Sequence, residues 1–169
     1  MTELPELQRY SMETTEQMLA YEGRYDNTSI IMMIGEAIDL KWTHKGEETV
    51  SAAEKIVDAI WSLEVDVMNG GFGSFFGGSS ARYTPMIVDA LRSAGSPKAA
   101  EITQKAIDAL ELPELTEEAI ERAIESGNLE MEDKLDKYGN AYADTRDEED
   151  VMANLLAFIR ANRESIRIP

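Results

Sequence analysis

The sequence contains no cysteine and a single histidine, His44. Without cysteine the chain can form neither a disulfide bond nor a thiolate zinc site, and it has no cysteine nucleophile. A single histidine excludes any site that needs two imidazole ligands, which removes most zinc enzymes. We therefore expect no metal and no cofactor, and the cysteine-free composition suits a cytoplasmic protein.

The sequence also lacks a long apolar run. The longest, SIIMMIGEAIDL at residues 29–40, is interrupted by Glu36 and Asp39 and is too short to cross a bilayer. The opening residues MTELPELQRY carry acidic side chains where a secretory signal needs positive charge. We expect a protein that does not interact with a membrane.

Basic residues are scarce. Sixteen lysines and arginines stand against thirty-three acidic residues, which gives a formal net charge of −17. A chain of this charge is repelled by nucleic acid and by anionic membrane surfaces. We therefore expect no direct binding to nucleic acid, and any large charged partner should be a basic protein.

What the sequence does contain is a repeated helical pattern, over a length of 169 residues that is typical of one domain. Apolar residues recur three and four positions apart, and no alternating run typical of a strand occurs. The sequence predicts an all-α protein, a single compact multi-helix domain of about eight helices. The expected helices cover residues 4–21, 28–42, 51–68, 84–94, 97–110, 116–126, 130–138 and 146–163.

Capping signals mark several of the expected helix starts. Thr14, Ser51 and Thr145 each begin a capping box, a hydroxyl residue followed three positions later by Glu or Gln. Thr84 and Ser96 each precede a proline, which is typical of an N-cap before the first helical residue. By contrast, the basic tail RESIRIP ends on proline and indicates a frayed terminus.

The segment NGGFGSFFGG at residues 69–78 interrupts the helical pattern with five glycines and three phenylalanines. It is not a phosphate-binding loop, because the GxxxxGK[ST] pattern is absent and no predicted strand precedes it. Asn-Gly-Gly can end a helix, and phenylalanine side chains are usually buried. We interpret the segment as a structural corner whose rings turn inward. The alternative interpretation is an exposed aromatic loop that binds a partner. The residues of this structural loop are Asn69, Gly70, Gly71, Phe72, Phe75 and Phe76.

This box and two later segments resemble a bacterial protein family, formerly a domain of unknown function, whose namesake is an acidic DNA-mimic protein. The box is followed by the alanine-rich pair DALRSAGSPKAAEITQKAIDAL, and Leu135, Asp136 and Tyr138 lie in a turn before a closing helix. The family often has asparagine soon after the aromatic pair, where this chain has glycine. The resemblance covers residues 51–165 and implies an all-helical, non-enzymatic protein that mimics DNA. Residues 1–50 show no such match, and we expect them to add N-terminal helices to the same domain.

Acidic residues are concentrated in the second half of the chain. Residues 111–150 hold fifteen of the thirty-three acids but four of the sixteen bases. We hypothesise that segments 114–125 and 130–150 lie on one face and present carboxylates to a basic protein. A plainer explanation stays open, because acids also crowd the solvated face of amphipathic helices and complement the dipole at helix starts. The expected partner-binding residues are Glu114, Glu117, Glu118, Glu121, Glu125, Glu130, Glu132, Asp133, Asp147, Glu148, Glu149 and Asp150.

The residues fit two binding functions. The first is an acidic, non-enzymatic protein that mimics DNA and occupies the nucleic-acid site of a basic DNA-binding protein such as a transcription factor. The second is an immunity-type inhibitor of a basic toxin or nuclease, since opposite charge speeds encounter. A homodimer is compatible with either function.

A carboxylate-based enzyme is the third alternative. With no cysteine and one histidine, the remaining chemistry is a carboxylate pair or an oxygen-ligated metal. Glu36 and Asp39 are spaced as the polar side of a helix, whereas Glu64 and Asp66 point to different sides of theirs. The EF-hand spacing is absent, and His44 fits a loop at a helix end. We therefore expect no enzyme activity.

Overall fold

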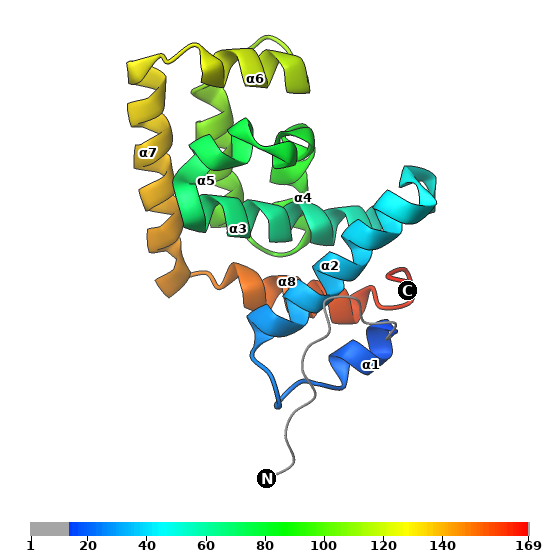
Figure 1. The fold of residues 1–169 in the computed structure, drawn as a ribbon. Coiled ribbons are helices and arrows are strands. Elements are labelled where there is room, and N and C mark those ends of the chain that lie inside the picture. Colours follow the sequence, from blue (N-terminus) through cyan, green and yellow to red (C-terminus); the bar gives the residue numbers. More distant parts are fainter. Residues whose placement is uncertain (1–13, 169) are drawn as a thin grey trace.

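A computed structural model describes residues 14–168, and over this range the chain forms eight α-helices and three short 3-10 helices without a strand (Figure 1). The prediction of an all-α fold is confirmed. The α-helices are α1 Thr15–Leu19, α2 Asn27–Lys45, α3 Ala52–Gly77, α4 Ile87–Ser93, α5 Pro97–Asp108, α6 Glu117–Glu125, α7 Leu129–Asp144 and α8 Val151–Ala161. The 3-10 helices are η1 Glu47–Thr49, η2 Ser79–Tyr83 and η3 Thr145–Asp147.

Helix α3 is the central element of the fold (Figure 1). It packs against α2, α4, α6, α7, α8 and η2. Its apolar stripe supplies Val57, Ile60 and Leu63, each with no exposed surface, to the hydrophobic core. The helices around it are short and each covers a different part of α3, so the direction of α3 fixes where the other elements lie.

Two of the predicted N-caps differ from the structure. Thr14 and Ser51 do form capping boxes at the starts of α1 and α3. Thr145, however, donates its hydroxyl to the carbonyl of Tyr142 at 2.7 Å and ends α7, so α8 begins later, at Val151. Thr84 follows η2, and α4 begins only at Ile87. Asp150, and not Thr145, therefore caps α8, and α4 begins without a side-chain cap.

The glycine-rich segment has its corner at Gly70 and Gly71, which are not helical, whereas the residues that follow are helix rather than loop. Helix α3 does not end near residue 68 but continues to Gly77 across a kink. Gly70 has φ −155° and ψ 18°, and Gly71 has φ 70° and ψ −173°. The second conformation is essentially restricted to glycine. Two glycines therefore change the direction of the helix within one turn, and the helix then resumes.

The three phenylalanines after the kink are buried, with exposed fractions of 0%, 0% and 1% for Phe72, Phe75 and Phe76. Their rings pack on one another, and Phe72 also meets Tyr142 of α7 edge-on at 5.8 Å between ring centroids. Burial of all three rings excludes an exposed aromatic loop. The three rings thus form part of the hydrophobic core on which α7 packs against α3.

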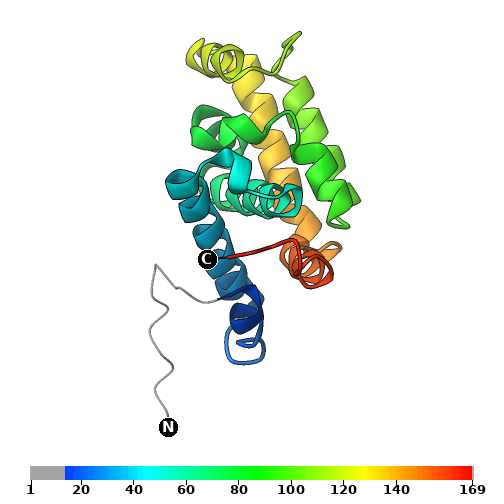
Figure 2. The same cartoon turned by 90° about the vertical axis from the view of Figure 1, so that its right-hand side faces the viewer.

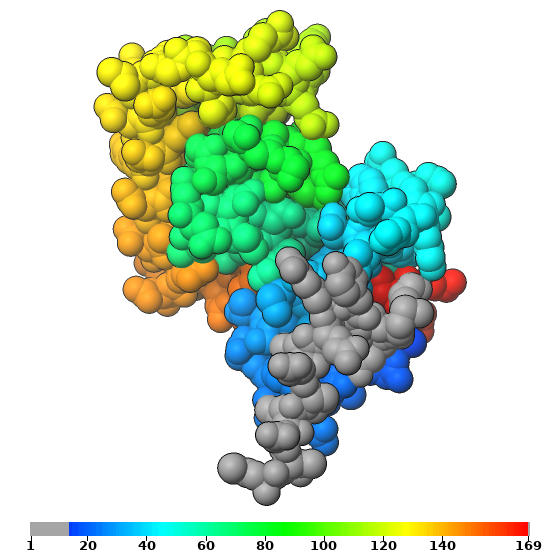
Figure 3. Space-filling model, viewed as in Figure 1, coloured from blue at the N-terminus to red at the C-terminus, as the bar shows by residue number. Residues whose placement is uncertain are grey.

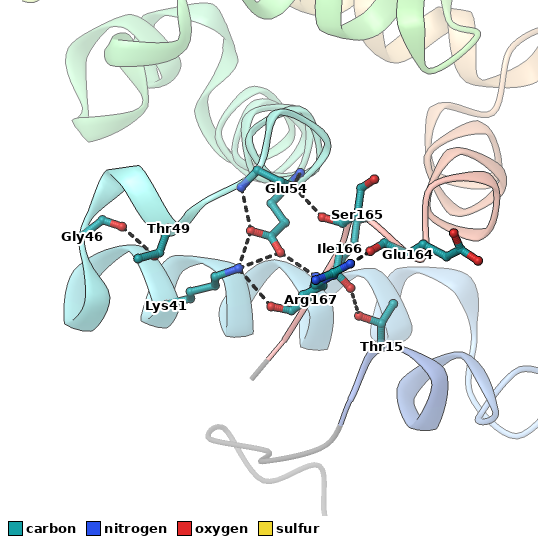
Figure 4. A network of polar contacts seen from close by, with 10 residues as sticks. Thr15, Lys41, Gly46, Thr49, Glu54, Glu164, Ser165, Ile166 and Arg167 are labelled. Carbon is teal, nitrogen blue, oxygen red and sulfur yellow. Dashed lines mark hydrogen bonds and ion pairs between the residues drawn. The ribbon is translucent and has the colours of Figure 1, made fainter.

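The C-terminal tail is docked on the protein, so the predicted frayed terminus is wrong for residues 165–168 (Figure 4). Ile166 and Ile168 are buried. Ser51 donates its hydroxyl to the Ser165 carbonyl at 2.6 Å, and the Arg167 amide donates to Glu54 at 2.6 Å. Backbone hydrogen bonds at residues 165–167 and two buried isoleucines hold the tail in place.

The N-terminal part of the chain packs on the helices that follow. Helix α1 packs on α2, and α2 packs on α3 and α8. Glu22, in the turn between α1 and α2, accepts a hydrogen bond from Arg160 of α8 at 2.7 Å. Of the helix expected over 4–21, residues 4–13 lie outside the described residues. No helix in the described range is long and apolar enough to cross a membrane.

We predict that Gly71→Ala lowers the free energy of unfolding by about 1–3 kcal/mol, because an alanine must adopt the glycine-only conformation of the kink. The added Cβ would meet no atom within 4 Å, so strain rather than a clash causes the loss. Chemical denaturation measures the change.

Gly73→Ala is the matched control, because the same Cβ also meets nothing within 4 Å there but the backbone is helical. Alanine should stabilise this position by up to about 1 kcal/mol. Equal effects of the two substitutions would contradict the role assigned to Gly71.

Candidate functional site

Helix α6 turns its acidic side to solvent because its apolar side is held against the core. Thr116 caps its start by accepting the Ala119 amide at 3.2 Å. Ile120 is fully buried, and α6 packs on α3 and η2. The glutamates on the other side of α6 are therefore exposed.

Helix α7 is anchored by a buried carboxylate. Glu64 of α3, 4% exposed, accepts a hydrogen bond from the Tyr142 hydroxyl at 2.6 Å and another from Arg146 at 3.1 Å. Burial, and then the Glu64 charge, raise the pKa of Tyr142, so the hydroxyl keeps its proton and remains a donor. With Met131, Leu135 and Tyr142 buried, the acidic side of α7 faces outward.

The two acidic helices meet at one corner of the molecule. Only residues 126–128 separate them, and α6 lies across one end of the fold while α7 runs down the adjoining side (Figures 1 and 2). In the space-filling view, α6 and the first turns of α7 form an outer edge of the protein (Figure 3). The helices thus follow one another around a corner and do not lie side by side.

Eight carboxylates around this corner are exposed and have no ion pair or side-chain hydrogen bond among residues 14–168. We call them the acidic strip. Arg122, the one base on α6, uses its Nε to donate to the Glu118 carbonyl oxygen at 3.2 Å and leaves the carboxylates unpaired. The strip consists of Glu114, Glu117, Glu118, Glu121, Glu125, Glu132, Asp133 and Asp136.

The spacing of charge on α6 resembles one strand of a duplex. Its acids at 117, 118, 121 and 125 span about 12 Å at a rise of about 1.5 Å per residue, which is a mean spacing of roughly 4 Å between charges along the axis. Duplex DNA carries one charge per about 3.4 Å on each strand and one per about 1.7 Å overall. Two acidic helices would need to lie side by side to reach the charge density of both DNA strands. Because α7 is not parallel to α6, the strip approaches the charge density of one strand.

Four of the twelve predicted partner-binding acids make contacts within the protein, which leaves their predicted role in partner binding a prediction. Glu130 pairs with Lys134, and Glu148 pairs with Lys98; the attraction to these lysines lowers the pKa of each glutamate. Asp150 caps α8 by accepting the Ala153 amide at 2.9 Å. Of the remaining eight, seven belong to the strip, and Asp147 in η3 is exposed without an ion pair within the described part of the chain.

Glu149 caps a helix that is distant in the sequence. Its two carboxylate oxygens accept the amides of Lys98 at 3.1 Å and Ala99 at 2.8 Å, at the start of α5. Ser96 occupies the N-cap position but makes no capping hydrogen bond there. Residue spacing gave no signal for this contact, because about fifty residues separate its partners.

Among the other candidates from the sequence, Glu36 and Asp39 of α2 lie together at one pocket, and the rest are dispersed. His44 is exposed in the last turn of α2. Glu64 is occupied by Tyr142 and Arg146, whereas Asp66 on the same helix has no ion pair among the described residues. Within residues 14–168, no three carboxylates or imidazoles come close enough together to hold a metal ion.

We predict that Glu149→Gln lowers the free energy of unfolding by about 1 kcal/mol, because the amide can accept from only one of the two α5 amides and leaves the helix start less neutralised. Asp147→Asn removes the same charge two residues away, where residues 14–168 offer no partner, and should change stability by less than about 0.5 kcal/mol. Thermal and chemical denaturation compare the two. A loss as large for Asp147→Asn would refute the capping role of Glu149.

Comparison with known proteins places the chain in a family. A model described as DMP19-like protein matches residues 48–162, which is more than half of the chain and spans η1 to the end of α8. No match was found among curated proteins or among solved structures. The name DMP19 stands for DNA mimic protein 19, so the family suggests a DNA-mimic role. On the strength of this match, the chain belongs to the DMP19-like protein family.

Proposed function

We propose that this protein occupies the DNA-binding site of a basic protein by presenting the acidic strip in place of a phosphate backbone. The observation that carries the proposal is a set of eight exposed carboxylates on α6, on α7 and just before α6, none of which has a partner within residues 14–168. The family suggests the role in general terms, and the strip supplies the residues that would perform it in this chain.

The strip is poised to bind because its charges repel one another in the free protein. Glu117, Glu121 and Glu125 lie one helical turn apart, where like charges are mildly destabilising. Lysine and arginine side chains of a partner would relieve this repulsion, and opposite charge would also speed the encounter. Because the carboxylates already face solvent, few internal contacts are lost on binding.

The strip is held on a rigid support, which lowers the cost of binding. Caps at Thr116 and Asn128 fix the starts of α6 and α7. The buried pairing of Glu64 with Tyr142 fixes the far end of α7. A charged surface whose backbone is held in this way loses little conformational entropy when a partner binds.

We predict that the triple variant Glu117→Gln, Glu121→Gln and Glu125→Gln loses at least tenfold in affinity for the retained partner. The partner would be isolated from a nuclease-treated lysate of the host on immobilised wild-type protein, identified, purified and titrated by calorimetry. A short DNA duplex should displace it, and added salt should weaken the complex.

The matched control is Glu48→Gln, Asp66→Asn and Glu164→Gln. This variant has the same change in net charge, and none of the three side chains has an ion pair within residues 14–168. It should bind within about twofold of the wild type, because net charge alone acts weakly at this distance in physiological salt.

Each outcome has a separate meaning. A DNA-binding protein that is displaced by duplex and lost in the α6 variant supports mimicry. A retained protein that ignores duplex DNA would favour the immunity-type inhibitor. If both triple variants bind equally, the acidic strip is not the interface and the proposal fails.

A further inference from the structure

A cavity of about 480 Å³ lies between α2, α3 and η2, away from the acidic strip. This volume is in the range of small-molecule sites. Glu36 and Asp39 of α2, Asp58 and Trp61 of α3, and Ser80 and Arg82 of η2 are among its lining residues. Three acids against one base give the lining a net negative charge.

The innermost acid, Asp58, is incompletely satisfied. Its side chain is 4% exposed, and its Oδ2 accepts a short hydrogen bond from the Tyr83 hydroxyl. The Arg82 guanidinium stands 3.7 Å from Asp58 and 3.8 Å from Asp39, beyond the usual 2.7–2.9 Å of a charge-assisted hydrogen bond. Burial raises the pKa of Asp58, with the Tyr83 hydrogen bond acting in the opposite direction. The fold therefore keeps a carboxylate where its charge is costly.

Ser80 is a second unused polar group. The residue is 9% exposed and lines the cavity, yet its hydroxyl makes no hydrogen bond to any part of the chain that the structure describes. The hydroxyl oxygen itself is not fully buried, so it is open to the cavity and can donate to or accept from a ligand group.

The aromatic wall of the cavity depends on a glycine in α2. A Cβ on Gly35 would come within 2.7 Å of Trp61 Cδ1, so only glycine lets the indole lie against this helix. Glycine inside a helix costs up to about 1 kcal/mol relative to alanine. Nearby, the Arg82 guanidinium already stacks on Trp42 and Tyr83, 4.6 Å and 4.8 Å from the ring centroids. These two faces are taken by Arg82, so Trp61 is the aromatic side chain that the cavity offers to a ligand cation.

We propose that this cavity binds an organic cation with an ammonium or guanidinium group. The carboxylates surround the space without converging, and no metal-binding cluster occurs in residues 14–168, so a molecule larger than an ion fits them better. The cation would pair with Glu36 and Asp39, approach Asp58, and use Ser80 as a hydrogen-bond partner. A free amine and a basic side chain of another protein share this chemistry.

The test uses agmatine, which carries both groups, titrated into the full-length protein by calorimetry. Tryptophan fluorescence gives a second readout, because Trp61 lines the cavity and Trp42 stacks on Arg82. We expect saturable one-to-one binding that weakens at least tenfold in Glu36→Gln with Asp39→Asn. Ser80→Ala should weaken it severalfold.

The control variant is Glu48→Gln with Asp66→Asn, which removes the same number of charges from η1 and α3, outside the cavity. It should bind agmatine as the wild type does. Absence of saturable binding, or equal binding by both double variants, overturns the proposal, since non-specific attraction to a protein of net charge −17 would affect both alike.

Two further probes separate the sources of the cation. Putrescine represents a free diamine, and an arginine blocked at both ends as N-acetyl-arginine amide represents a partner's side chain. Tighter binding of putrescine assigns the cavity to a small metabolite-like amine, and tighter binding of the blocked arginine assigns it to a docking protein. Failure of agmatine and both probes to bind would disprove the site.

Discussion

Three buried carboxylates on α3 hold the remote parts of this protein together. Glu54, Asp58 and Glu64 are 0%, 3% and 4% exposed. Glu54 accepts from Lys41 of α2 at 2.8 Å and from the tail amide of Arg167, Asp58 accepts from Tyr83 of η2, and Glu64 accepts from Tyr142 and Arg146. A buried charge left without its partner costs about 3–5 kcal/mol, so each acid specifies which segment must lie beside it.

The buried carboxylates on α3 also affect how many surface acids can form ion pairs. The chain has sixteen bases for thirty-three acids, and Lys41, Arg82 and Arg146 are drawn toward buried carboxylates. Two buried acids accept hydrogen bonds from tyrosine hydroxyls. A hydroxyl satisfies the carboxylate without a lysine or arginine, but it does not neutralise the negative charge. Most surface acids must therefore remain unpaired. In the acidic strip and in the cavity, carboxylates that outnumber the nearby bases face solvent.

Sequence patterns were informative wherever the cause of a structure is local. Helical periodicity, the capping boxes at Thr14 and Ser51 and the exposure of the α6 glutamates all depend on neighbours within about one turn. They failed where a distant segment decides the outcome. Glu149 caps a helix about fifty residues away, and the tail is docked by α2 and α3. Glycine signalled a break at residues 70–71, but only the packing that follows makes it a kink instead of an end.

The glycines after the kink explain why this segment governs the acidic strip. A Cβ on Gly139 of α7 would stand 3.4 Å from the Gly71 Cα, so α7 crosses α3 backbone to backbone at the kink. Six residues on, a Cβ on Gly77 would stand 3.5 Å from Ile124 of α6. Both acidic helices thus approach the short second half of α3, and the buried phenylalanines between these two glycines fill the space under them. The direction that α3 takes after Gly71 consequently sets the angle between α6 and α7, and with it the path of the carboxylates around the corner.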